Sequence, residues 1–462
     1  MDRSNEPQRE LFETVRLAGQ QGVLRFWESL DGPSRNRLVS ELEEVNFEEV
    51  ASLFGKFAPE GAFATQDQSA LKPVRYTALP AAGGDRSAWS RAAKVGEAAI
   101  RSGKVASLTV AGGQGTRLGF DGPKGMFPIT PVKGKSLFEV LAAKIRASSA
   151  EFECHLPWYV MTSVENHAAT VAYFADNQYF GLDPADIRFF RQGRLPAVDF
   201  EGRILLSSRN SIAMSPDGHG GSLRALARSG ALEEMKREGV ESISYFHVDN
   251  PLVRPVDPTF IGFHVLGGSE MSSKTALKAY SHEKIGTFCR DGNGIRVIEY
   301  SDLPESLGEA RGKDGRLKFH AGSVGIHILN RNFVERITSG KSDTYALPFH
   351  RAEKIVDTID DAGRPVIPKT ANAIKFEMFL FDAIPFARNP VIVETDRRDE
   401  FSPVKNSVGI DSAESCRADL LRMWTRWLCA AGEHIRCDDT GLPEAVFEVD
   451  PLFADDAETF VK

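Results

Sequence analysis

The sequence predicts an α/β protein built on a central, mainly parallel sheet, and three observations support this fold class. Short apolar runs alternate with helix-like segments between residues 104 and 250. Several of these runs end in glycines or polar residues, as buried strands do where a binding loop follows. The length of 462 residues, with 42% hydrophobic and 26% charged residues, matches a soluble globular chain with two or three domains.

The first 100 residues or so are expected to form helices joined by polar linkers. One run keeps helical spacing and is interrupted by Gly32-Pro33; its apolar residues are Val23, Leu24, Phe26, Trp27 and Leu30. No residue type in this region suggests chemistry, so we expect a scaffold or an interaction role for it.

The next segments predict repeated strand–helix units. The expected strands are "KVASLTVAGG" (104–113), "LPWYVMTS" (156–163) and "SISYFHVDN" (242–250), and the expected helices are "SLFEVLAAKIRAS" (136–148) and "VENHAATVAYFADN" (164–177). Ligands of such sheets bind beyond the carboxyl ends of the strands. The glycines after the first strand, "MTS" and "VDN" therefore have the potential to converge on one site.

The rest of the chain predicts a β-rich insertion and a small final unit. Residues 269–330 contain strand-like pieces with a turn at Asp291-Gly292, which suits an insertion beside the substrate. Beyond about residue 395 the pattern is mixed. The expected domains are a helical region at 1–100, a catalytic domain at 101–395 and a C-terminal domain at 396–462.

Composition excludes several classes of protein. The net charge of −8 argues against a general nucleic-acid or membrane-surface binder, although local cations can still hold an anionic substrate. No stretch approaches the roughly 20 apolar residues of a membrane span, and no signal peptide is apparent. The five cysteines are scattered and odd in number, which favours a reduced, cytoplasmic protein.

The glycine-rich stretch "VAGGQGTRLGFDGPKG" (110–125) has the composition of a phosphate-binding loop but neither of the two best-known patterns. A dinucleotide fingerprint would need glycine at Leu118, and a P-loop ending at Gly134-Lys135-Ser136 would need glycine at Ile129. The latter tripeptide is expected to be a turn before the helix that begins near Leu137. A dehydrogenase is therefore excluded by spacing.

What remains is a nest of backbone N–H groups flanked by two cations. Glycines allow the backbone to approach phosphate oxygens closely. Arg117 can grip a phosphate with two parallel hydrogen bonds, and Lys124 adds a compact positive charge. This combination suits a polyphosphate that undergoes substitution at phosphorus.

The loop, within "LTVAGGQGTRLGFDGPKGMFPI", resembles the signature of the nucleotidyltransferases that make UDP-sugars. The resemblance is greatest to the eukaryotic-type UDP-N-acetylglucosamine pyrophosphorylases and covers most of the chain. It also includes "FFRQGRLPAVDFEGRILL", "SPDGHGG", "YFHVDNPLVRPVDPTFIGF", "VIEYSDL", "NAIKFEMFLFD" and "DEFSPVKN". It implies a Rossmann-like nucleotidyltransferase sheet and a reaction of UTP with a sugar 1-phosphate that releases pyrophosphate.

The resemblance implies specific roles for residues around the nucleotide. Arg117 and Lys124 would hold the triphosphate and stabilise the departing pyrophosphate, while Lys405 and Lys375 would contact the sugar phosphate. Gln192 would contact uracil, whose edge offers both a donor and an acceptor. Backbone contacts to the nucleotide are expected from Gly112, Gly113, Gly115 and Gly218.

Asp249 is the expected ligand of Mg²⁺ or another divalent cation. It follows an apolar strand, and a carboxylate that faces a triphosphate is a natural magnesium ligand. The alternative is that Asp249 caps the turn that follows. Asp217 and Asp399 are weaker candidates for a second ligand.

The residues expected at the sugar depart in part from the family pattern. His219 replaces the asparagine of "PDGNGG", and His320 and Ser323 replace both asparagines of "NAGN". Glu299 matches a carboxylate that binds sugar hydroxyls. The remaining expected sugar-binding residues are Asn250, Phe379 and Phe381, the two phenylalanines as walls of an N-acetyl pocket.

The favoured function is a uridylyltransferase that converts UTP and N-acetylglucosamine 1-phosphate to UDP-N-acetylglucosamine and pyrophosphate. An enzyme for glucose 1-phosphate, galactose 1-phosphate or a broad set of sugars is the first alternative, because lost polar contacts change sugar discrimination more than apolar walls. A non-catalytic UDP-sugar sensor is an alternative of another class. Such a sensor could have lost Arg117, Lys124 and Asp249, all of which are present.

Overall fold

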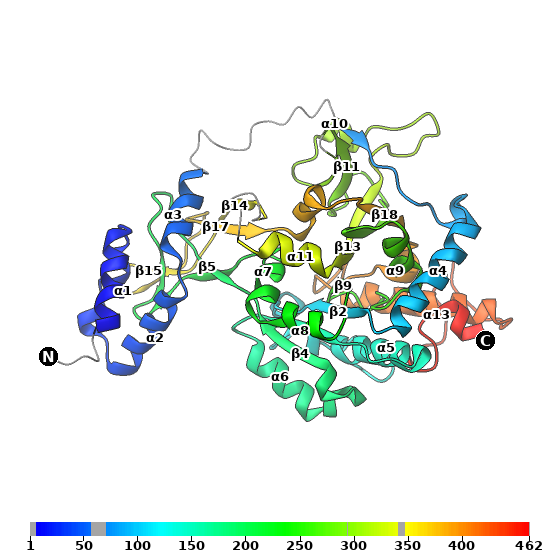
Figure 1. Ribbon diagram of the computed structural model, residues 1–462, viewed down its shortest axis with the longest axis horizontal. Helices are drawn as coiled ribbons and strands as arrows, with labels where there is room; N and C mark the ends of the chain where they lie inside the picture. Colours follow the sequence, from blue (N-terminus) through cyan, green and yellow to red (C-terminus); the bar gives the residue numbers. More distant parts are fainter. Residues whose placement is uncertain (1–5, 57–70, 293, 341–346, 462) are drawn as a thin grey trace. The chain divides into compact units, whose positions relative to one another are not determined.

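The computed structural model describes residues 6–56, 71–292, 294–340 and 347–461 (Figure 1). The chain divides into two compact units. Unit 1 contains Met1–Asp67, Gln192–Ser222 and Leu347–Leu380, and unit 2 contains Gln68–Arg191, Leu223–Ala346 and Phe381–Lys462. The expected helical region at 1–100 extends over 1–5 and 57–70, which lie outside the described residues. The division into domains at 1–100, 101–395 and 396–462 stays a prediction.

Unit 2 is built on a mixed sheet whose parallel half contains the predicted strands. In the order of the sheet the predicted strands are β9 (Ser242–His247), β2 (Val105–Val110) and β3 (Trp158–Thr162), and they are followed by β4 (Ile187–Arg191), which was not predicted. All three pairings between these neighbours are parallel. Their carboxyl ends therefore share one edge of the sheet, as predicted.

Antiparallel strands extend the sheet beyond β9. They are β13 (Ala321–Asn330), β10 (Met271–Leu277), β11 (Thr287–Asp291), β12 (Gly294–Ile298) and β1 (Lys72–Pro73), while β18 (Val391–Glu394) pairs with β10 in parallel. The strand-like pieces expected in residues 269–330 are confirmed as strands. They continue the main sheet instead of forming a sheet of their own, because β13 pairs directly with β9.

Helices surround this sheet and bury its faces. They are α4 (Arg86–Arg101), α5 (Leu137–Phe152), α6 (His167–Asp176), α7 (Gly221–Arg228), α8 (Ala231–Arg237), α9 (Pro258–Leu266), α10 (Glu305–Gly308), α11 (Arg331–Thr338), α12 (Arg397–Glu400), α13 (Ala413–Ala430) and α14 (Ala457–Val461). Short 3-10 turns are η5 (Pro80–Ala82), η6 (Thr116–Leu118), η7 (Lys124–Met126), η8 (Gln178–Gly181), η9 (Pro184–Asp186) and η10 (Leu380–Phe386).

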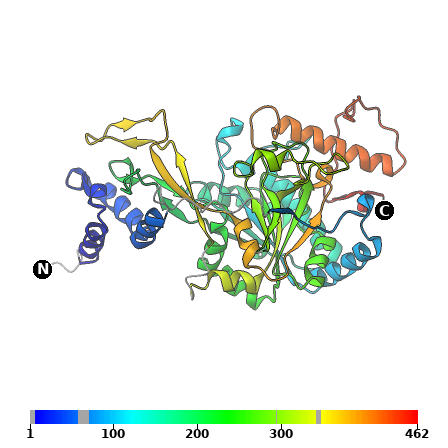
Figure 2. The same cartoon turned by 90° about the horizontal axis from the view of Figure 1, so that it is seen from above.

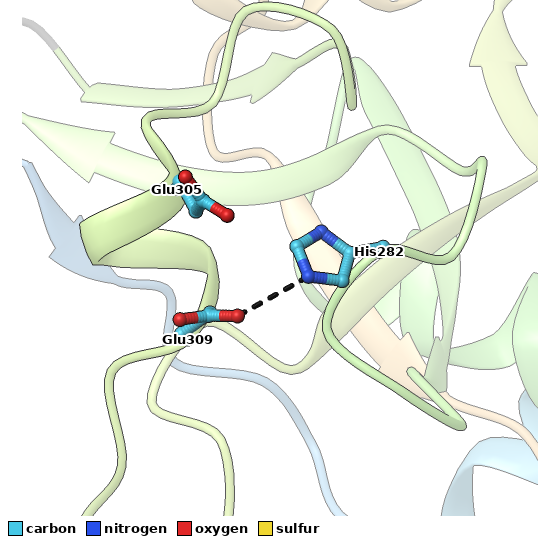
Figure 3. A group of neighbouring side chains, drawn as sticks. All are labelled: His282, Glu305 and Glu309. Carbon is cyan, nitrogen blue, oxygen red and sulfur yellow. Dashed lines mark hydrogen bonds and ion pairs between the residues drawn. The ribbon is translucent and has the colours of Figure 1, made fainter.

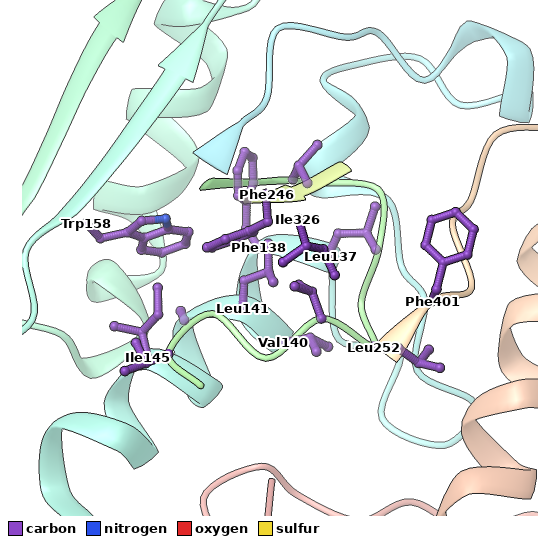
Figure 4. Packing of buried hydrophobic residues seen from close by; sticks show 14 of the residues in the cluster. Leu137, Phe138, Val140, Leu141, Ile145, Trp158, Phe246, Leu252, Ile326 and Phe401 are labelled. Carbon is purple, nitrogen blue, oxygen red and sulfur yellow. The ribbon is translucent and has the colours of Figure 1, made fainter. Parts of the chain in front are cut away.

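An extensive hydrophobic core lies where α5 packs on the sheet. Figure 4 shows Leu137, Phe138 and Leu141 of this helix beside Trp158 of β3 and Phe246 of β9, all of them fully buried. The predicted turn before α5 is confirmed. Ser136 accepts a hydrogen bond from the Glu139 N–H and the Glu139 carboxylate accepts one from the Ser136 N–H, which fixes the start of the helix.

Unit 1 combines the N-terminal helices with small antiparallel sheets (Figure 2, blue helices, green and yellow strands). Its helices are α1 (Glu6–Leu17), α2 (Gly32–Glu43) and α3 (Phe47–Lys56). Its strand pairs are β5 (Arg194–Pro196) with β8 (Met214–Pro216), β6 (Leu206–Ser208) with β7 (Ser211–Ile212), β14 (Phe349–Lys354) with β17 (Ala373–Met378), and β15 (Thr358–Ile359) with β16 (Pro365–Val366).

One helical expectation in unit 1 needs correction. The apolar run around Val23 and Leu30 forms two short 3-10 turns, η2 (Gln21–Leu24) and η3 (Trp27–Ser29), and not a continuous α-helix. Gly32-Pro33 starts α2 instead, because proline is tolerated in the first turn and Asp31 caps it by accepting from the Ser34 N–H. Within the described residues, no helix is both long enough and apolar enough to cross a membrane.

Candidate functional site

The glycine loop folds back on itself directly after β2. The Gly115 N–H donates to the Gly122 carbonyl at 2.8 Å, and the Lys124 N–H donates to the Gly113 carbonyl at 3.0 Å. Buried Asn166, at the start of α6, donates from its side-chain amide to the Ala111 carbonyl at 2.9 Å. These bonds fix the base of the loop, and the predictions from sequence did not include Asn166 as its anchor.

Two positions of the loop, 113 and 125, carry glycine for different structural reasons. A Cβ on Gly125 would lie 2.1 Å from the Phe138 ring, so packing in the core requires glycine there. A Cβ on Gly113 would meet nothing closer than the Lys124 side chain, at 3.9 Å, and Gly113 is exposed. The fold itself therefore does not require glycine at position 113, and its missing side chain leaves room for an external group.

Lys124 and Asp249 form an ion pair at the carboxyl ends of β2 and β9. Their Nζ and Oδ2 atoms are 3.4 Å apart, and each side chain is 16% exposed. Burial would raise the pKa of Asp249, but Lys124, Lys405 and His247 outweigh burial and hold this pKa below its usual value. Asp249 is thus a stable carboxylate among cations, suited to a metal ion and phosphates.

Lys405 is brought to the same place by the segment after α12. The Val404 N–H donates to the Asp249 carbonyl at 2.8 Å, and the Lys405 N–H donates to the Asp411 carbonyl. The Lys405 ammonium also lies 5.9 Å from the centre of the Phe401 ring. Lys124, Asp249 and Lys405, three residues predicted from sequence, therefore form one charged group, which we call the Asp249 cluster.

His247 lies beside the Asp249 cluster and was not predicted from the sequence. Burial lowers the pKa of His247, and Lys405 and Lys124 lower it further against the opposite effect of Asp249. The imidazole is therefore neutral near pH 7. A Cβ on Gly325 would lie 2.9 Å from its ring, so β13 approaches it closely. The only signal in the sequence was its place in "YFHVDN", two residues before Asp249.

Arg117 lies on the exposed part of the glycine loop, in η6. No hydrogen bond or ion pair of its guanidinium occurs with any of the residues that the structure describes. An exposed guanidinium held on a folded loop is available for an anion.

The residues around Asp249 fit a magnesium ion with one protein carboxylate. Mg²⁺ keeps several waters and is commonly held by one or two carboxylates together with substrate phosphates. Asp399 pairs with Arg426 at 2.6 Å, and Asp217 Oδ1 accepts from Gln192 Nε2 at 3.3 Å; a role of either carboxylate as a second metal ligand stays a prediction. The chemistry of the Asp249 carboxylate and the neighbouring cations thus suits a metal–triphosphate complex.

A separate group of potential metal ligands lies on the surface of unit 2. His282, Glu305 and Glu309 bring their ligand atoms within 4.8 Å of one another, and all three are exposed (Figure 3). His282 Nε2 and Glu309 Oε1 are 3.2 Å apart. Since the hydrogen bond between His282 and Glu309 already gives a reason for this arrangement, the group is an ordinary exposed polar contact with a neighbouring carboxylate.

Two predicted sugar-binding residues of unit 2 lie near the same glycine. The Ser323 N–H donates to the Gly286 carbonyl at 2.8 Å, and a Cβ on Gly286 would lie 3.6 Å from Glu299 Oε1. A third predicted sugar-binding residue of unit 2, Phe381, lies in η10 and is buried, with 8% of its surface exposed. The resemblance implies that Ser323 and Glu299 bind the sugar, and these roles stay predictions.

His320 and Asn250 have structural partners instead. His320 Nδ1 lies 2.6 Å from the Leu317 carbonyl, which can only accept, so Nδ1 carries the proton and Nε2 accepts from the Tyr76 hydroxyl at 3.0 Å. Asn250 is 4% exposed; it donates to the Glu400 carbonyl at 2.7 Å and accepts from the Ser402 N–H. The sugar-binding role of Asn250 stays a prediction, and its amide already joins two backbone segments.

In unit 1, Gln192 is positioned by the "DGHGG" turn. Its Nε2 donates to the Gly218 carbonyl at 2.8 Å and to Asp217 Oδ1 at 3.3 Å. Gly218 has φ +83°, and a Cβ there would lie 2.3 Å from the Met378 carbonyl oxygen. The Gln192 amide thus has its donors engaged, and within the described residues its Oε1 forms no hydrogen bond, which leaves an acceptor for a ligand N–H.

His219 and Phe379 also lie together in unit 1. Their ring centres are 5.5 Å apart, and the His350 ring is 4.5 Å from Phe379. The Leu380 N–H donates to His219 Nδ1, so the neutral imidazole carries its proton on Nε2. Lys375 lies on β17, where burial lowers its pKa.

Gln192, Gly218, His219, Lys375 and Phe379 belong to unit 1, and the other predicted site residues belong to unit 2.

Similarity to known proteins agrees with these features. Residues 73–424 match the model of the family described as UTP–glucose-1-phosphate uridylyltransferase. The chain is 35% identical to the UDP-N-acetylhexosamine pyrophosphorylase-like protein 1 of Mus musculus, over 97% of this chain and 93% of that protein. It is also 35% identical to the UDP-N-acetylglucosamine pyrophosphorylase of Saccharomyces cerevisiae, over 91% of each chain.

Solved structures support the same relationship. A crystal structure titled as a putative UDP-N-acetylglucosamine pyrophosphorylase from Entamoeba histolytica is 32% identical, with a TM-score of 0.75 over 85% of this chain and 96% of that one. The Trypanosoma brucei enzyme described as a uridine diphosphate N-acetylglucosamine pyrophosphorylase is 27% identical, with a TM-score of 0.83 over 97% and 93%. With the family match over most of its length, the chain belongs to the UTP–glucose-1-phosphate uridylyltransferase family.

Proposed function

We propose that this protein transfers a uridylyl group from UTP to N-acetylglucosamine 1-phosphate and releases pyrophosphate. The single observation that carries the proposal is the Asp249 cluster: two lysines and a charged carboxylate beside a glycine loop with an exposed Gly113 and Arg117. Relatives with about a third of their residues identical are named UDP-N-acetylglucosamine diphosphorylase or UDP-N-acetylglucosamine pyrophosphorylase, which supports the choice of sugar.

In this reaction a phosphate oxygen of the sugar 1-phosphate attacks the α-phosphorus of UTP. The new bond joins that oxygen to phosphorus, and the bond from phosphorus to the bridging oxygen of pyrophosphate breaks. Charge develops on the transferring phosphoryl group and on the leaving pyrophosphate. Lys124 and Arg117 would neutralise the triphosphate oxygens, and Lys405, and by resemblance Lys375, would hold the sugar phosphate.

Asp249 would bind Mg²⁺ or another divalent cation, which supplies charge neutralisation and orients the phosphates. The Lys124 ammonium, now 3.4 Å from the Asp249 carboxylate, would then turn to phosphate oxygens. The lowered pKa of Asp249 keeps the carboxylate charged well below neutral pH, so metal binding would not depend on its titration near pH 7.

Gln192 would recognise uracil through its free acceptor. Its Oε1 suits the N3–H of uracil, while Gly218 and Asp217 keep its amide nitrogen oriented. Cytosine carries no proton at N3, so this contact would favour uridine nucleotides.

A broader sugar specificity is the second candidate, and one observation favours it. Two of the polar residues expected at the sugar, His219 and Ser323, stand where the family has asparagines. A changed polar partner alters discrimination between sugars more than an apolar wall does. Glucose or galactose 1-phosphate would then compete with the N-acetylated sugar.

All five cysteines are free thiols, which supports our expectation of a cytoplasmic location.

The test is a panel of glucose, galactose, N-acetylglucosamine and N-acetylgalactosamine 1-phosphates with UTP and Mg²⁺. We expect pyrophosphate release with N-acetylglucosamine 1-phosphate at the highest kcat/KM, and loss of release when EDTA removes the metal. Release only with glucose or galactose 1-phosphate would favour the second candidate. Binding of UDP-sugars with no release for any of the four would leave a non-catalytic sensor.

A further inference from the structure

The buried side-chain amide of Asn250 joins the turn after β9 to residues 400–405, which we call the Lys405 segment. Asn250 follows Asp249 in the chain and is 4% exposed. Its Nδ2 donates to the Glu400 carbonyl at 2.7 Å, and its Oδ1 accepts from the Ser402 N–H at 3.1 Å. The Asp249 carbonyl accepts a third hydrogen bond, from the Val404 N–H at 2.8 Å. Two consecutive residues of the turn therefore hold three residues of the segment.

These three hydrogen bonds follow the pattern of a neighbouring strand. The bonded residues are every second residue of the Lys405 segment, and alternate residues of an extended chain face the same side. The segment is extended at Phe401, with φ −143° and ψ 101°. Asn250 thus supplies from its side chain the donor and the acceptor that a strand would supply from its backbone. Because Lys405 comes directly after the last bonded residue, this pairing fixes its backbone beside Asp249.

The Lys405 segment is also supported by other parts of unit 2. The Glu400 carboxylate binds buried Lys274 of β10, and the Ser402 hydroxyl donates to Asp419 Oδ2 of α13 at 2.8 Å. Phe401 belongs to the hydrophobic core that Figure 4 shows. The segment is therefore held by the sheet, by a helix and by the core, and the amide bonds tie the turn after β9 to that support.

The contacts of Asn250 leave little of its side chain for a sugar. Its amide nitrogen and its amide oxygen are both bonded to backbone groups. We propose that Asn250 is a positioning residue for uridylyl transfer, which sets Lys405 beside Asp249 and does not contact the sugar. This inference rests on the proposed function. Its physical basis is that a charged group stabilises a transferring phosphoryl group only at the right distance, and a misplacement of about 1 Å can lower the rate by about 10²-fold.

Asn250→Ala removes both amide bonds and adds no charge. We expect it to lower kcat by roughly 10–100-fold, because Lys405 and Asp249 lose their fixed separation. The relative kcat/KM values for the four sugar 1-phosphates should stay the same, since no sugar contact is lost. Asn177→Ala is the matched control and should leave kcat unchanged, because Asn177 also donates to a backbone carbonyl, that of Tyr173 at 2.8 Å, but is exposed.

A double-mutant cycle with Lys405→Ala separates positioning from a general loss of structure. If Asn250 acts through Lys405, kcat of the double variant should match that of Lys405→Ala within about twofold, whereas independent effects would multiply. Hydrogen exchange followed by mass spectrometry gives a readout that needs no turnover. Residues 401–406 should exchange faster in the Asn250→Ala chain than in the unchanged chain, while β2 stays protected.

Melting temperatures are measured first. Asn250→Ser, whose hydroxyl can bond one of the two backbone groups, replaces the alanine variant if that chain unfolds at the assay temperature. Changed relative kcat/KM values among the sugars would show that Asn250 contacts the sugar and would overturn the proposal. So would an unchanged kcat, losses that multiply in the double variant, or unchanged exchange in residues 401–406. Absence of pyrophosphate release from the unchanged chain would instead refute the proposed function, and hydrogen exchange alone would then decide whether Asn250 holds the Lys405 segment.

Discussion

At the scale of single residues, the Asp249 cluster shows how burial and charge decide protonation. Asp249 and His247 are both shielded from solvent, yet the same two lysines have opposite consequences for them. Lys124 and Lys405 hold the pKa of the Asp249 carboxylate low against the effect of burial, whereas burial, with a smaller effect of the same lysines, lowers the pKa of the His247 imidazole. The cluster therefore carries two positive charges and one negative charge at neutral pH, a balance that suits phosphate oxygens and a metal ion.

Lys124→Ala should lower kcat by about 10²–10³-fold, because it removes a cation from the phosphoryl group as charge develops. Binding of UMP, which lacks the β- and γ-phosphates, should change little. Steady-state kinetics and calorimetry measure the two quantities. Lys133→Ala is the matched control, since Lys133 also pairs with an aspartate but is 60% exposed. Equal losses of turnover and UMP affinity would contradict a role for Lys124 in the transition state.

At the scale of elements, the glycine loop contains positions that serve folding and positions that serve a ligand. The packing of Gly125 against Phe138 ties the loop to α5, and the exposure of Gly113 leaves its backbone open. A glycine-rich sequence alone does not separate these purposes, because both positions simply lack a side chain.

Two alanine variants test this division. Gly125→Ala should destabilise the fold by about 1–3 kcal/mol, because its methyl group overlaps the Phe138 ring. Gly113→Ala should change the free energy of unfolding by less than about 0.5 kcal/mol. It should instead weaken UTP binding by about tenfold, or about 1.4 kcal/mol. Denaturant unfolding measures the free energy of unfolding, and calorimetry measures the UTP affinity. An unchanged UTP affinity of the Gly113→Ala chain would show that Gly113 is not part of the nucleotide site.

The start of α9 carries a charge that should make stability depend on pH. Asp257 caps the helix by accepting from the Thr259 N–H and pairs with Lys274. Burial would raise its pKa, but Lys274 and Arg254 outweigh burial and lower the pKa from 3.8 to about 2. The folded state holds the proton less tightly than the unfolded chain, so this contribution is complete above the unfolded pKa and is lost as the pH falls toward 2.

Asp257→Asn should therefore cost about 3 kcal/mol at pH 7, because the amide keeps the cap but loses the buried ion pair. The difference in unfolding free energy from the unchanged chain should shrink between about pH 5 and the lowest pH at which the chain stays folded. Urea unfolding at several pH values measures it. Asp85→Asn, at the exposed cap of α4, is the control and should show a small, nearly constant difference. A difference in unfolding free energy that grows as the pH falls would refute the role of the Asp257 charge.

At the scale of the whole molecule, unit 1 is assembled from three distant parts of the chain. Buried Glu41 of α2 joins two of them: its carboxylate accepts from the Ser211 hydroxyl at 2.9 Å and from the Ile212 N–H at 2.7 Å. The long loops between these parts cost entropy on closure, so such polar contacts help to hold the unit together.

Glu41→Ala should destabilise unit 1 by about 1–3 kcal/mol, because two buried donors lose their acceptor. Hydrogen exchange followed by mass spectrometry should show faster exchange in residues 206–216 as well as in α2, while β2 of unit 2 stays protected. Glu43→Ala, at an exposed position of the same helix, should leave both rates unchanged. Faster exchange confined to α2 would show that α2 and residues 206–216 do not unfold together.

The sequence by itself determined the parallel strands, the glycine loop, the cations Arg117 and Lys124, and Asp249 at a strand end. These features are local: apolar periodicity over a few residues predicts an element, and its end predicts the edge of the sheet. The sequence did not predict that β10 and β13 extend the same sheet, because strand pairing depends on partners far along the chain.

Only the tertiary structure decided which long-range partners each residue has. Tyr76 and His320, or Glu400 and Asn250, are far apart in sequence and meet because the fold brings their backbones together. The same holds for the effect of Lys124 and Lys405 on the pKa of His247. Burial, charge balance and hydrogen-bond satisfaction are properties of packed neighbours, and the linear sequence around a residue does not contain those neighbours.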